Sequence, residues 1–170
     1  MKKLLLSIAM FTFALTVSAQ DYGVIGGFNN TIAKASGGGI TASDGISGLF
    51  VGFFGDFEVS EKFNIQPEVH YIAVFRDGDS GNAIALPVLA KYYVSEQFSV
   101  QAGPMIDVIL DEAPDGFNTF GFGIAGGVGY DFDDHFMATA RYSFGLSNRV
   151  EIANVTTGYD YFQVGLGYKF

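Results

Sequence analysis

The chain has 170 residues, of which 9 are basic and 18 acidic, so its net charge is −9, and it contains no cysteine. The negative charge argues against a nucleic-acid partner, and the absence of thiols excludes a disulfide framework and cysteine chemistry. Hydrophobic residues make up 49% of the chain, with 18 Phe, 9 Tyr and 23 Gly but only 4 Pro. This composition favours a membrane barrel, in which apolar residues occupy every second position of many strands.

The first 19 residues have the three parts of a secretory signal peptide. Lys2 and Lys3 form a positive start, Leu4 to Val17 is an apolar run, and small residues follow up to Ala19. A retained transmembrane helix is the alternative, but the run is short and lacks a stop-transfer flank. We therefore expect a signal peptide over 1–19 and one domain over 20–170. Losing the two lysines would take the net charge from −9 to −11.

The rest of the chain shows eight stretches in which apolar and polar residues alternate, the pattern of half-buried β-strands. Their length is close to the 9–11 residues that a tilted strand needs to cross a bilayer. The predicted strands cover 22–32, 45–58, 63–75, 83–94, 98–110, 118–132, 136–147 and 158–170. Pro67, Pro87 and Pro104 fall inside strands and predict bulges or locally unpaired positions.

The connections alternate between short and long along the chain. A short turn between aromatic residues recurs as 57–63, 92–98 and 130–136, an internal repeat. The longer, more polar connections are 33–44, 76–82, 111–117 and 148–157. Transmembrane barrels combine short periplasmic turns with longer outer loops. The sequence thus predicts an eight-stranded antiparallel transmembrane β-barrel, an up-and-down meander with both termini in the periplasm.

One face of the predicted strands is apolar and the other is polar. An apolar exterior around a polar interior suits a barrel in lipid, whereas a soluble lipocalin-like barrel, the alternative, would expose its aromatics to water. The polar face predicts a lumen network made of Glu68, Lys91, Gln101, Asp107 and Arg141. The aromatics beside the short turns predict a periplasmic girdle made of Phe57, Phe63, Tyr92, Phe98, Phe132 and Phe136.

The last eight residues end on an aromatic pattern. Gln163, Gly165, Tyr168 and Phe170 resemble the C-terminal signal that the barrel-assembly machinery reads. The ordered segments 65–71, 86–93, 100–104 and 122–130 resemble the PorT-like outer-membrane β-barrel domain family of Bacteroidota type. The resemblance implies an outer-membrane location and brings no shared catalytic residues; some members serve protein secretion.

Candidate catalytic and metal-binding residues are few. His70 faces inward with Ser143 and Asp107, but the sequence does not place them side by side. The stretch 77–81 starts like a calcium loop, yet position 88, where the closing glutamate would stand, is Val88. We therefore expect no catalytic residue, no metal and no cofactor.

The functional expectation is a non-enzymatic outer-membrane protein with a plugged polar lumen and a structural, docking or accessory role in the envelope, with secretion or uptake machinery as the candidate setting. The expected partners are outer-membrane lipid, the barrel-assembly machinery during biogenesis and an envelope protein, and not nucleic acid. The alternatives are a narrow channel for ions or small solutes and, further off, a lipid- or peptide-processing barrel enzyme.

Overall fold

The computed structural model describes residues 20–37, 40–76, 79–111, 116–150 and 155–170. They form eight strands, and the predicted signal peptide over 1–19 lies outside the described residues. The strands are β1 (Gln20–Gly37), β2 (Ile40–Ser60), β3 (Phe63–Arg76), β4 (Asp79–Tyr93), β5 (Phe98–Ile109), β6 (Phe120–Asp131), β7 (Phe136–Gly145) and β8 (Val155–Lys169). Within the described residues, no helix is long and apolar enough to cross a membrane.

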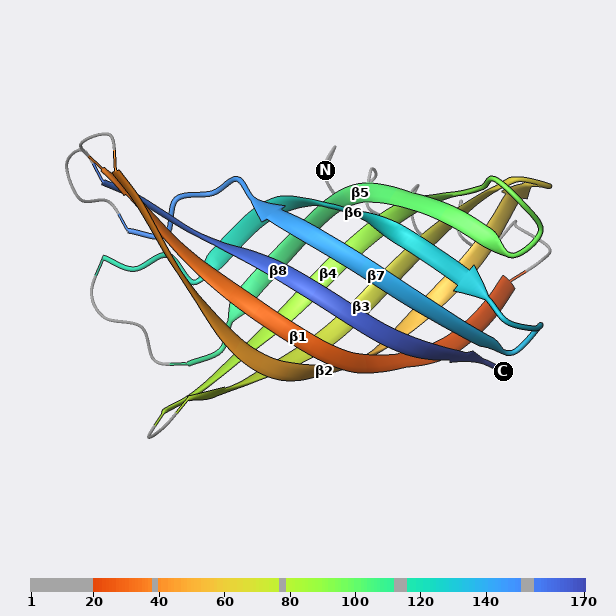
Figure 1. Cartoon of the computed structure of the whole chain (residues 1–170), viewed down its shortest axis with the longest axis horizontal. Coiled ribbons are helices and arrows are strands. Elements are labelled where there is room, and N and C mark those ends of the chain that lie inside the picture. The colour runs from red at the N-terminus through yellow and green to blue at the C-terminus, as the bar shows by residue number, and fades with distance from the viewer. Residues whose placement is uncertain (1–19, 38–39, 77–78, 112–115, 151–154) are drawn as a thin grey trace, which may run out of the picture.

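The sheet closes on itself. Each strand pairs antiparallel with the next, and β1 pairs with β8 from Gly23–Lys169 to Gly37–Val155 (Figure 1). The predicted eight-stranded antiparallel barrel is confirmed. Closure leaves no sheet edge along the spanning part, as backbone groups in hydrocarbon require. We name the end that holds Phe170 and the short turns the turn end, and the opposite end the loop end.

The first two hairpins extend further at the loop end than the sequence predicts. The stretch 33–44 was expected to be a loop, but β1 and β2 stay paired up to Gly37–Ile40. The stretch 76–82 is likewise mostly strand, since β3 and β4 pair up to Arg76–Asp79. Both predictions were wrong because polar, small residues can continue a ladder once a neighbouring strand satisfies their backbone groups. The connections after β5 and β7 are longer, as expected.

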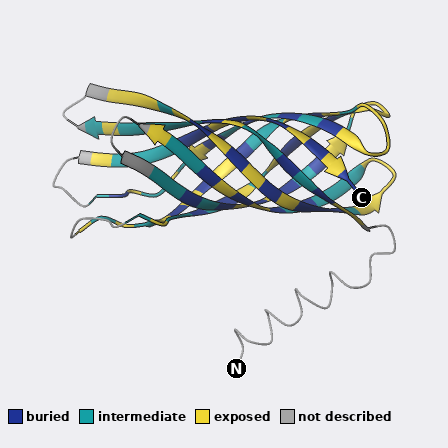
Figure 2. Cartoon of the chain, turned by 90° about the horizontal axis from the view of Figure 1, so that it is seen from below, coloured by how far each residue is buried: buried dark blue, intermediate teal, exposed yellow. Residues whose placement is uncertain are grey.

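Burial alternates along the strands, as Figure 2 shows by its alternating colours. The side chains that point inward include polar ones such as Gln66, Lys91 and Asp107, each exposed by no more than 2%, beside apolar ones such as Phe50 and Leu89. Outward side chains are large and apolar, such as Phe53 at 63% and Leu166 at 66% exposure. The apolar-out, polar-in pattern of a membrane barrel is therefore present on the folded chain.

The three strand prolines interrupt the ladder without changing its register. Each lies where two successive residue pairs are missing: Pro67 between β2 and β3, Pro87 between β3 and β4, and Pro104 between β4 and β5. Proline has no N–H to donate, so the backbone pairing of the ladder is lost at its position. Of the two predicted readings, local loss of pairing is the correct one. The register shift of the β2–β3 ladder lies elsewhere, between Glu58 and Ser60.

Inward-facing glycines make room for large lumen side chains. A Cβ added to Gly127 would lie 2.8 Å from Cγ of Arg141, and one added to Gly129 would lie 2.5 Å from Nε2 of Gln101. Both distances are shorter than real side chains tolerate. The glycine-rich β6 thus lets long polar side chains from other strands fill the interior.

Candidate functional site: the filled lumen and its two ends

The middle of the lumen is built around Glu68 on β3. Its Oε2 lies 2.5 Å from Nη1 of Arg141, which comes from β7 on the other side of the barrel, and 2.6 Å from Nε2 of His70. Gln66 donates from Nε2 to Oε1 of Glu68 at 2.5 Å. The Glu68 and Arg141 side chains are exposed by 0% and 3%. Burying such charges is costly unless they are paired and hydrogen-bonded, and here they are.

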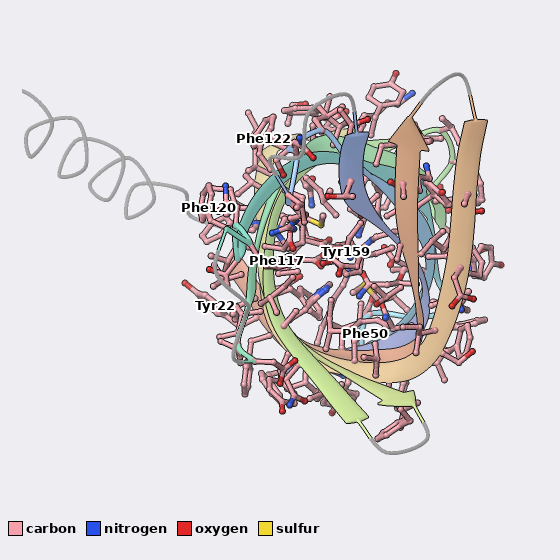
Figure 3. All side chains as sticks on the ribbon, turned by 90° about the vertical axis from the view of Figure 1, so that its left-hand side faces the viewer. Tyr22, Phe50, Phe117, Phe120, Phe122 and Tyr159 are labelled. Atoms are coloured by element: carbon pink, nitrogen blue, oxygen red, sulfur yellow. The ribbon has the colours of Figure 1, made fainter. Side chains whose placement is uncertain are left out.

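The same middle layer continues around Arg141. Its Nε donates to Oε1 of Gln101 at 2.9 Å, and Gln101 donates onward to Oγ of Ser99. On the other side, the ring of Phe50 packs against His70 with centroids 4.9 Å apart. Figure 3 shows Phe50 inside the barrel wall. The layer is thus a polar cluster bounded by an aromatic ring.

A second charged layer lies toward the turn end. Nζ of Lys91, a fully buried side chain, lies 3.2 Å from Oδ2 of Asp56 and 3.5 Å from Oδ2 of Asp131. Lys169 reaches the same two carboxylates, at 3.9 and 3.5 Å. Tyr93 donates to Asp131 at 2.7 Å, and its ring lies 4.8 Å from Nζ of Lys91. Two lysines and two aspartates balance each other in charge.

A third layer closes the lumen toward the loop end. Arg149, from the connection after β7, turns inward and pairs through Nη2 with Oδ2 of Asp107 on β5. Tyr161 on β8 donates its hydroxyl to the same oxygen at 2.7 Å. Nη1 of Arg149 donates to the carbonyl oxygen of Thr119 at 2.9 Å. Arg149 therefore fastens a connecting segment to the inside of the wall.

These ion pairs join strands that are not neighbours in the sheet. Glu68 and Arg141 connect β3 with β7, Lys91 connects β4 with β2 and β6, and Asp107 connects β5 with the segment after β7. The contacts therefore cross the lumen rather than run along the wall. Eight strands enclose an interior just wide enough for side chains, so such contacts fill it.

The structure places all five predicted lumen residues inside the barrel, with exposures between 0% and 6%. It brings Glu68, Gln101 and Arg141 together, whereas Lys91 belongs to the layer near the turn end and Asp107 to the layer near the loop end. Sequence reasoning missed Asp56, although it shares strand parity with the inward Phe50 and Phe54. It also missed Arg149, which was assigned to an outer loop and for which alternation gives no signal.

His70 does not gather the other residues of a hydrolytic triad. His70 contacts Glu68 and Phe50, while Asp107 is held by Arg149 and Tyr161 in another layer. Within the described residues, no group of three or more His, Asp or Glu side chains is placed to hold a metal ion. The start of the calcium-like stretch, Asp77 and Gly78, lies outside the described residues.

One polar cluster lies on the outer surface of the barrel. Lys34 pairs with Asp160, and Tyr142 donates its hydroxyl to Oδ2 of Asp160 at 2.6 Å. The Phe144 ring lies 4.5 Å from the Tyr142 ring and 6.0 Å from Nζ of Lys34. A carboxylate held by an ammonium and a phenol beside exposed aromatics is typical of the interface between lipid and water. The sequence did not predict this cluster.

The predicted girdle residues lie around the turn end. Tyr92, Phe132 and Phe136 are about half exposed, whereas Phe57, Phe63 and Phe98 are partly buried. Two residues of the predicted C-terminal signal join them, since the Tyr168 ring lies 5.1 Å from Phe136 and 5.9 Å from Phe170. Tyr22 packs edge-on against Phe57 and points outward in Figure 3. Of the remaining signal residues, Gln163 and Gly165 face inward.

The turn end opens into a cavity of about 980 Å³ with acidic walls. We call this cavity the acidic vestibule. Its floor is the layer of Asp56, Asp131 and Lys169, and its walls come from the turns. The acidic residues that line it are Asp21, Asp56, Glu58, Glu61, Glu96, Asp131, Asp133 and Asp134.

The polar turns of the acidic vestibule are organised by backbone hydrogen bonds. Oδ1 of Asp133 accepts from the backbone N–H groups of His135 at 2.8 Å and Phe136 at 2.7 Å. These two bonds lower the pKa of the Asp133 carboxyl below its ordinary value. The turn is therefore held best by the charged form of Asp133.

Comparison with known proteins shows which proteins the chain is similar to. Residues 80–151 match the family model described as outer membrane protein beta-barrel domain. This part of the chain is similar to outer-membrane β-barrel domains, and the whole described chain has the fold of an eight-stranded transmembrane β-barrel. The predicted resemblance is confirmed at this level. No curated protein sequence matches the chain.

Solved structures with the same fold are distant in sequence. Ail, the attachment invasion locus protein of Yersinia pestis, solved with the heparin analogue sucrose octasulfate, is 12% identical with a TM-score of 0.52; the match covers 89% of this chain and 99% of Ail. Neisserial surface protein A is 14% identical with a TM-score of 0.51, covering 90% and 100%. OprG from Pseudomonas aeruginosa is 18% identical with a TM-score of 0.50, covering 89% and 96%. At these identities the likeness describes the fold.

Proposed function

We propose that this protein is a non-enzymatic barrel with a closed lumen that acts as a structural or docking component of the outer membrane. The observation that carries the proposal is the set of ion pairs that cross the lumen in three layers, from Lys91 through Arg141 to Arg149. Paired side chains in a narrow barrel occupy the space that solutes would need. The surfaces that remain available to a partner are then the two exposed ends and the outer surface of the barrel.

The proposed orientation places the turn end in the periplasm and the loop end outside the cell. It is supported by the short turns at one end and the longer hairpins and connections at the other, as in other transmembrane barrels. A cleaved signal peptide over 1–19 and assembly through Gln163, Gly165, Tyr168 and Phe170 complete the proposed route to the membrane. The acidic vestibule would then face the periplasm, where a basic surface of an envelope protein of the secretion or uptake machinery could dock.

A narrow channel is the second candidate, and one observation favours it. Several buried polar atoms in the lumen have no hydrogen-bond partner, among them Nη2 of Arg141, Oε1 of Gln66 and Nε2 of Gln163. Unpaired polar atoms in a polar interior are sites where water is commonly held. A continuous file of such water would let small ions pass.

Single-channel recording in planar bilayers separates the two candidates. We expect the reconstituted protein to show no steady conductance, and Arg141→Gln, which breaks a pair that crosses the lumen, to give brief openings. Tyr92→Phe on the outer surface is the matched control and should change nothing. Steady conductance of the unaltered protein would overturn the closed-lumen proposal and favour the channel.

The docking role has its own test. Photo-cross-linking groups placed at Glu96 in the acidic vestibule should capture an envelope protein with a basic contact surface from native membranes. The same group at Leu49, on the lipid-facing side of β2, is the control and should capture lipid. Capture of the same products at both positions would contradict docking at the turn end.

A further inference from the structure

The loop end of the lumen contains space that the ion-pair layers do not fill. One cavity of about 160 Å³ is lined by residues of β1 to β5 and β8 and by Asp111, which follows β5, and we call it the inner chamber. A second cavity of about 370 Å³ lies beside it, and we call it the outer chamber. Tyr159 lines both, and Figure 3 shows it inside the mouth of the barrel.

The inner chamber is apolar although it lies in a barrel with a polar interior. Most of its exposed wall is apolar, from Ile46, Ile72, Val74, Ala83 and Ile109. The lining also includes Thr31, Asn82 and Asp111, and Asp111 accepts a hydrogen bond from the backbone N–H of Asn82. Its volume is close to that of a cavity that can hold a small hydrocarbon ring, and apolar cavities of this kind stay dry and take up apolar molecules. Space of this kind favours an apolar ligand over water.

The outer chamber owes its size to small side chains on the first hairpin. Ala33 and Ala35 on β1 and Ala42 on β2 line one side, and the Phe117 and Tyr159 rings, with centroids 6.5 Å apart, line another. Phe117 is held in place by a β-bridge to Val150. A volume of this size, with aromatic walls, lies within the range of small-molecule sites.

One buried polar group in the outer chamber lacks a partner. Arg149 lines the chamber and is 2% exposed, and its Nε has no hydrogen-bond acceptor, although its Nη atoms are used by Asp107 and by backbone carbonyls. Buried donors are rarely left unpaired in folded proteins. The donor thus supplies a fixed point for an oxygen of a ligand.

We propose that the two chambers together bind one amphipathic molecule, a medium-length acyl chain with an oxygen-bearing head group. The acyl chain occupies the inner chamber between Ile46, Ile72 and Ile109, and the head group accepts a hydrogen bond from Nε of Arg149. The Asp107–Arg149–Tyr161 layer forms the floor of the site. This binding site goes beyond the proposed structural role, and it does not depend on whether the lumen conducts.

Binding of a ligand in the chambers can be followed through the methyl groups of the isoleucine side chains. Protein in phospholipid nanodiscs, labelled at the isoleucine methyl groups, is titrated with decanoate and followed by methyl NMR. We expect saturable shifts at Ile46, Ile72 and Ile109. Ile25, buried in the lumen toward the turn end, and Ile124, exposed at 48% on the outer surface, are the internal controls. Shifts confined to Ile124, with no Overhauser contacts from the lipid chains to Ile72 and Ile109, would mean that decanoate only enters the lipid, and would overturn the proposal.

Two variants test the two parts of the ligand. Ala83→Phe fills the inner chamber and should abolish the saturable shifts, while Ala90→Phe, on the outer surface of the same strand, should leave them intact. Arg149→Lys keeps the charge but removes the Nε donor, and should weaken decanoate binding by on the order of tenfold. If Ala83→Phe does not fold, Ala33→Phe in the outer chamber serves the same purpose. Unchanged affinity in every filling variant that folds would overturn the proposal.

The source of the acyl chain is a separate arm of the experiment. Overhauser contacts between the nanodisc lipid chains and the methyl groups of Ile72 and Ile109, before any decanoate is added, would identify a membrane lipid tail as the occupant. Their absence together with saturable decanoate shifts would identify a free fatty acid. Absence of both signals would overturn the proposal.

Discussion

The middle of the lumen and its loop end are enclosed by the same eight strands but are filled differently. The middle holds long side chains, Arg141, Gln101 and Phe50, opposite glycines that make room for them. The loop end holds small side chains such as Ala83 and Ala33, and keeps two cavities. The number and pairing of the strands therefore do not determine whether a level of the lumen is filled or contains a cavity. The sizes of the inward residues at each level decide it.

The largest expected effect comes from the filled middle. Arg141→Ala leaves Glu68 buried without its guanidinium partner, and should lower the free energy of unfolding by about 3–5 kcal/mol. Urea unfolding in lipid vesicles measures this loss. The double variant Glu68→Gln with Arg141→Met should cost less than Arg141→Ala alone, because no unpaired charge remains. A loss below about 1 kcal/mol for Arg141→Ala would show that the middle is hydrated rather than filled.

A glycine of β6 tests the tightness of the layer toward the loop end. A methyl group on Gly121 would collide with the guanidinium of Arg149 and with Oδ1 of Asp107. Gly121→Ala should therefore lower the free energy of unfolding by about 1–3 kcal/mol, the usual cost of overpacking. Gly126→Ala is the matched control, since the nearest atom to its added Cβ is 3.8 Å away. Equal stability of the two variants would contradict the arrangement.

Two alanines on β4 compare the filled and the hollow level directly. Ala83 lines the inner chamber, whereas Ala85 is 1% exposed beside Asp107 in the filled part. Ala85→Val should cost about 1–2 kcal/mol through overpacking. Ala83→Val should cost nothing, or gain up to about 1 kcal/mol from the added apolar contact. Urea unfolding of the two variants is the measurement, and the reverse order would remove the distinction between the two levels.

The smallest expected effect lies outside the lumen, in an exposed turn. The lowered pKa of Asp133 means that its charged form stabilises the folded turn. Relative to Asp133→Asn, the unaltered protein should hold its full advantage above about pH 4, where an unfolded aspartate is charged. That advantage should disappear as the pH falls through the lower pKa of the folded state. Amide exchange of His135 and Phe136 against pH is the measurement, and a profile identical in both proteins would contradict the role.

Much of the fold follows from alternation in the sequence. The predicted strand 63–75 is observed as Phe63–Arg76, and the predicted strand 136–147 as Phe136–Gly145. Alternation works there because one face meets lipid and the other meets the lumen, so each residue type has a single acceptable side. Alternation does not predict the strand residues within 33–44. There the β1–β2 ladder continues beyond the apolar part of the barrel wall, and neither face of the strands needs to be apolar.

The pairing inside the lumen could not be predicted in the same way. Parity shows that Glu68 and Lys91 point inward, but not that Glu68 meets Arg141 while Lys91 meets Asp56. Those partners depend on strand tilt and on the stagger at which the barrel closes, and neither appears in a single sequence. Arg149 was missed because it enters the lumen from a connecting segment, where no periodicity applies.

The ion pairs that span the barrel also constrain the order in which the protein can be made. Glu68 and Arg141 are 73 residues apart on strands that never touch, so they cannot meet while the sheet is still an open ribbon. Until the first strand joins the last, these charges need water, because hydrocarbon would strip them of solvent without supplying a partner. The concave face of the folding sheet must therefore stay hydrated until β1 pairs with β8. The ion pairs that neutralise the charges of the lumen form only in that final step.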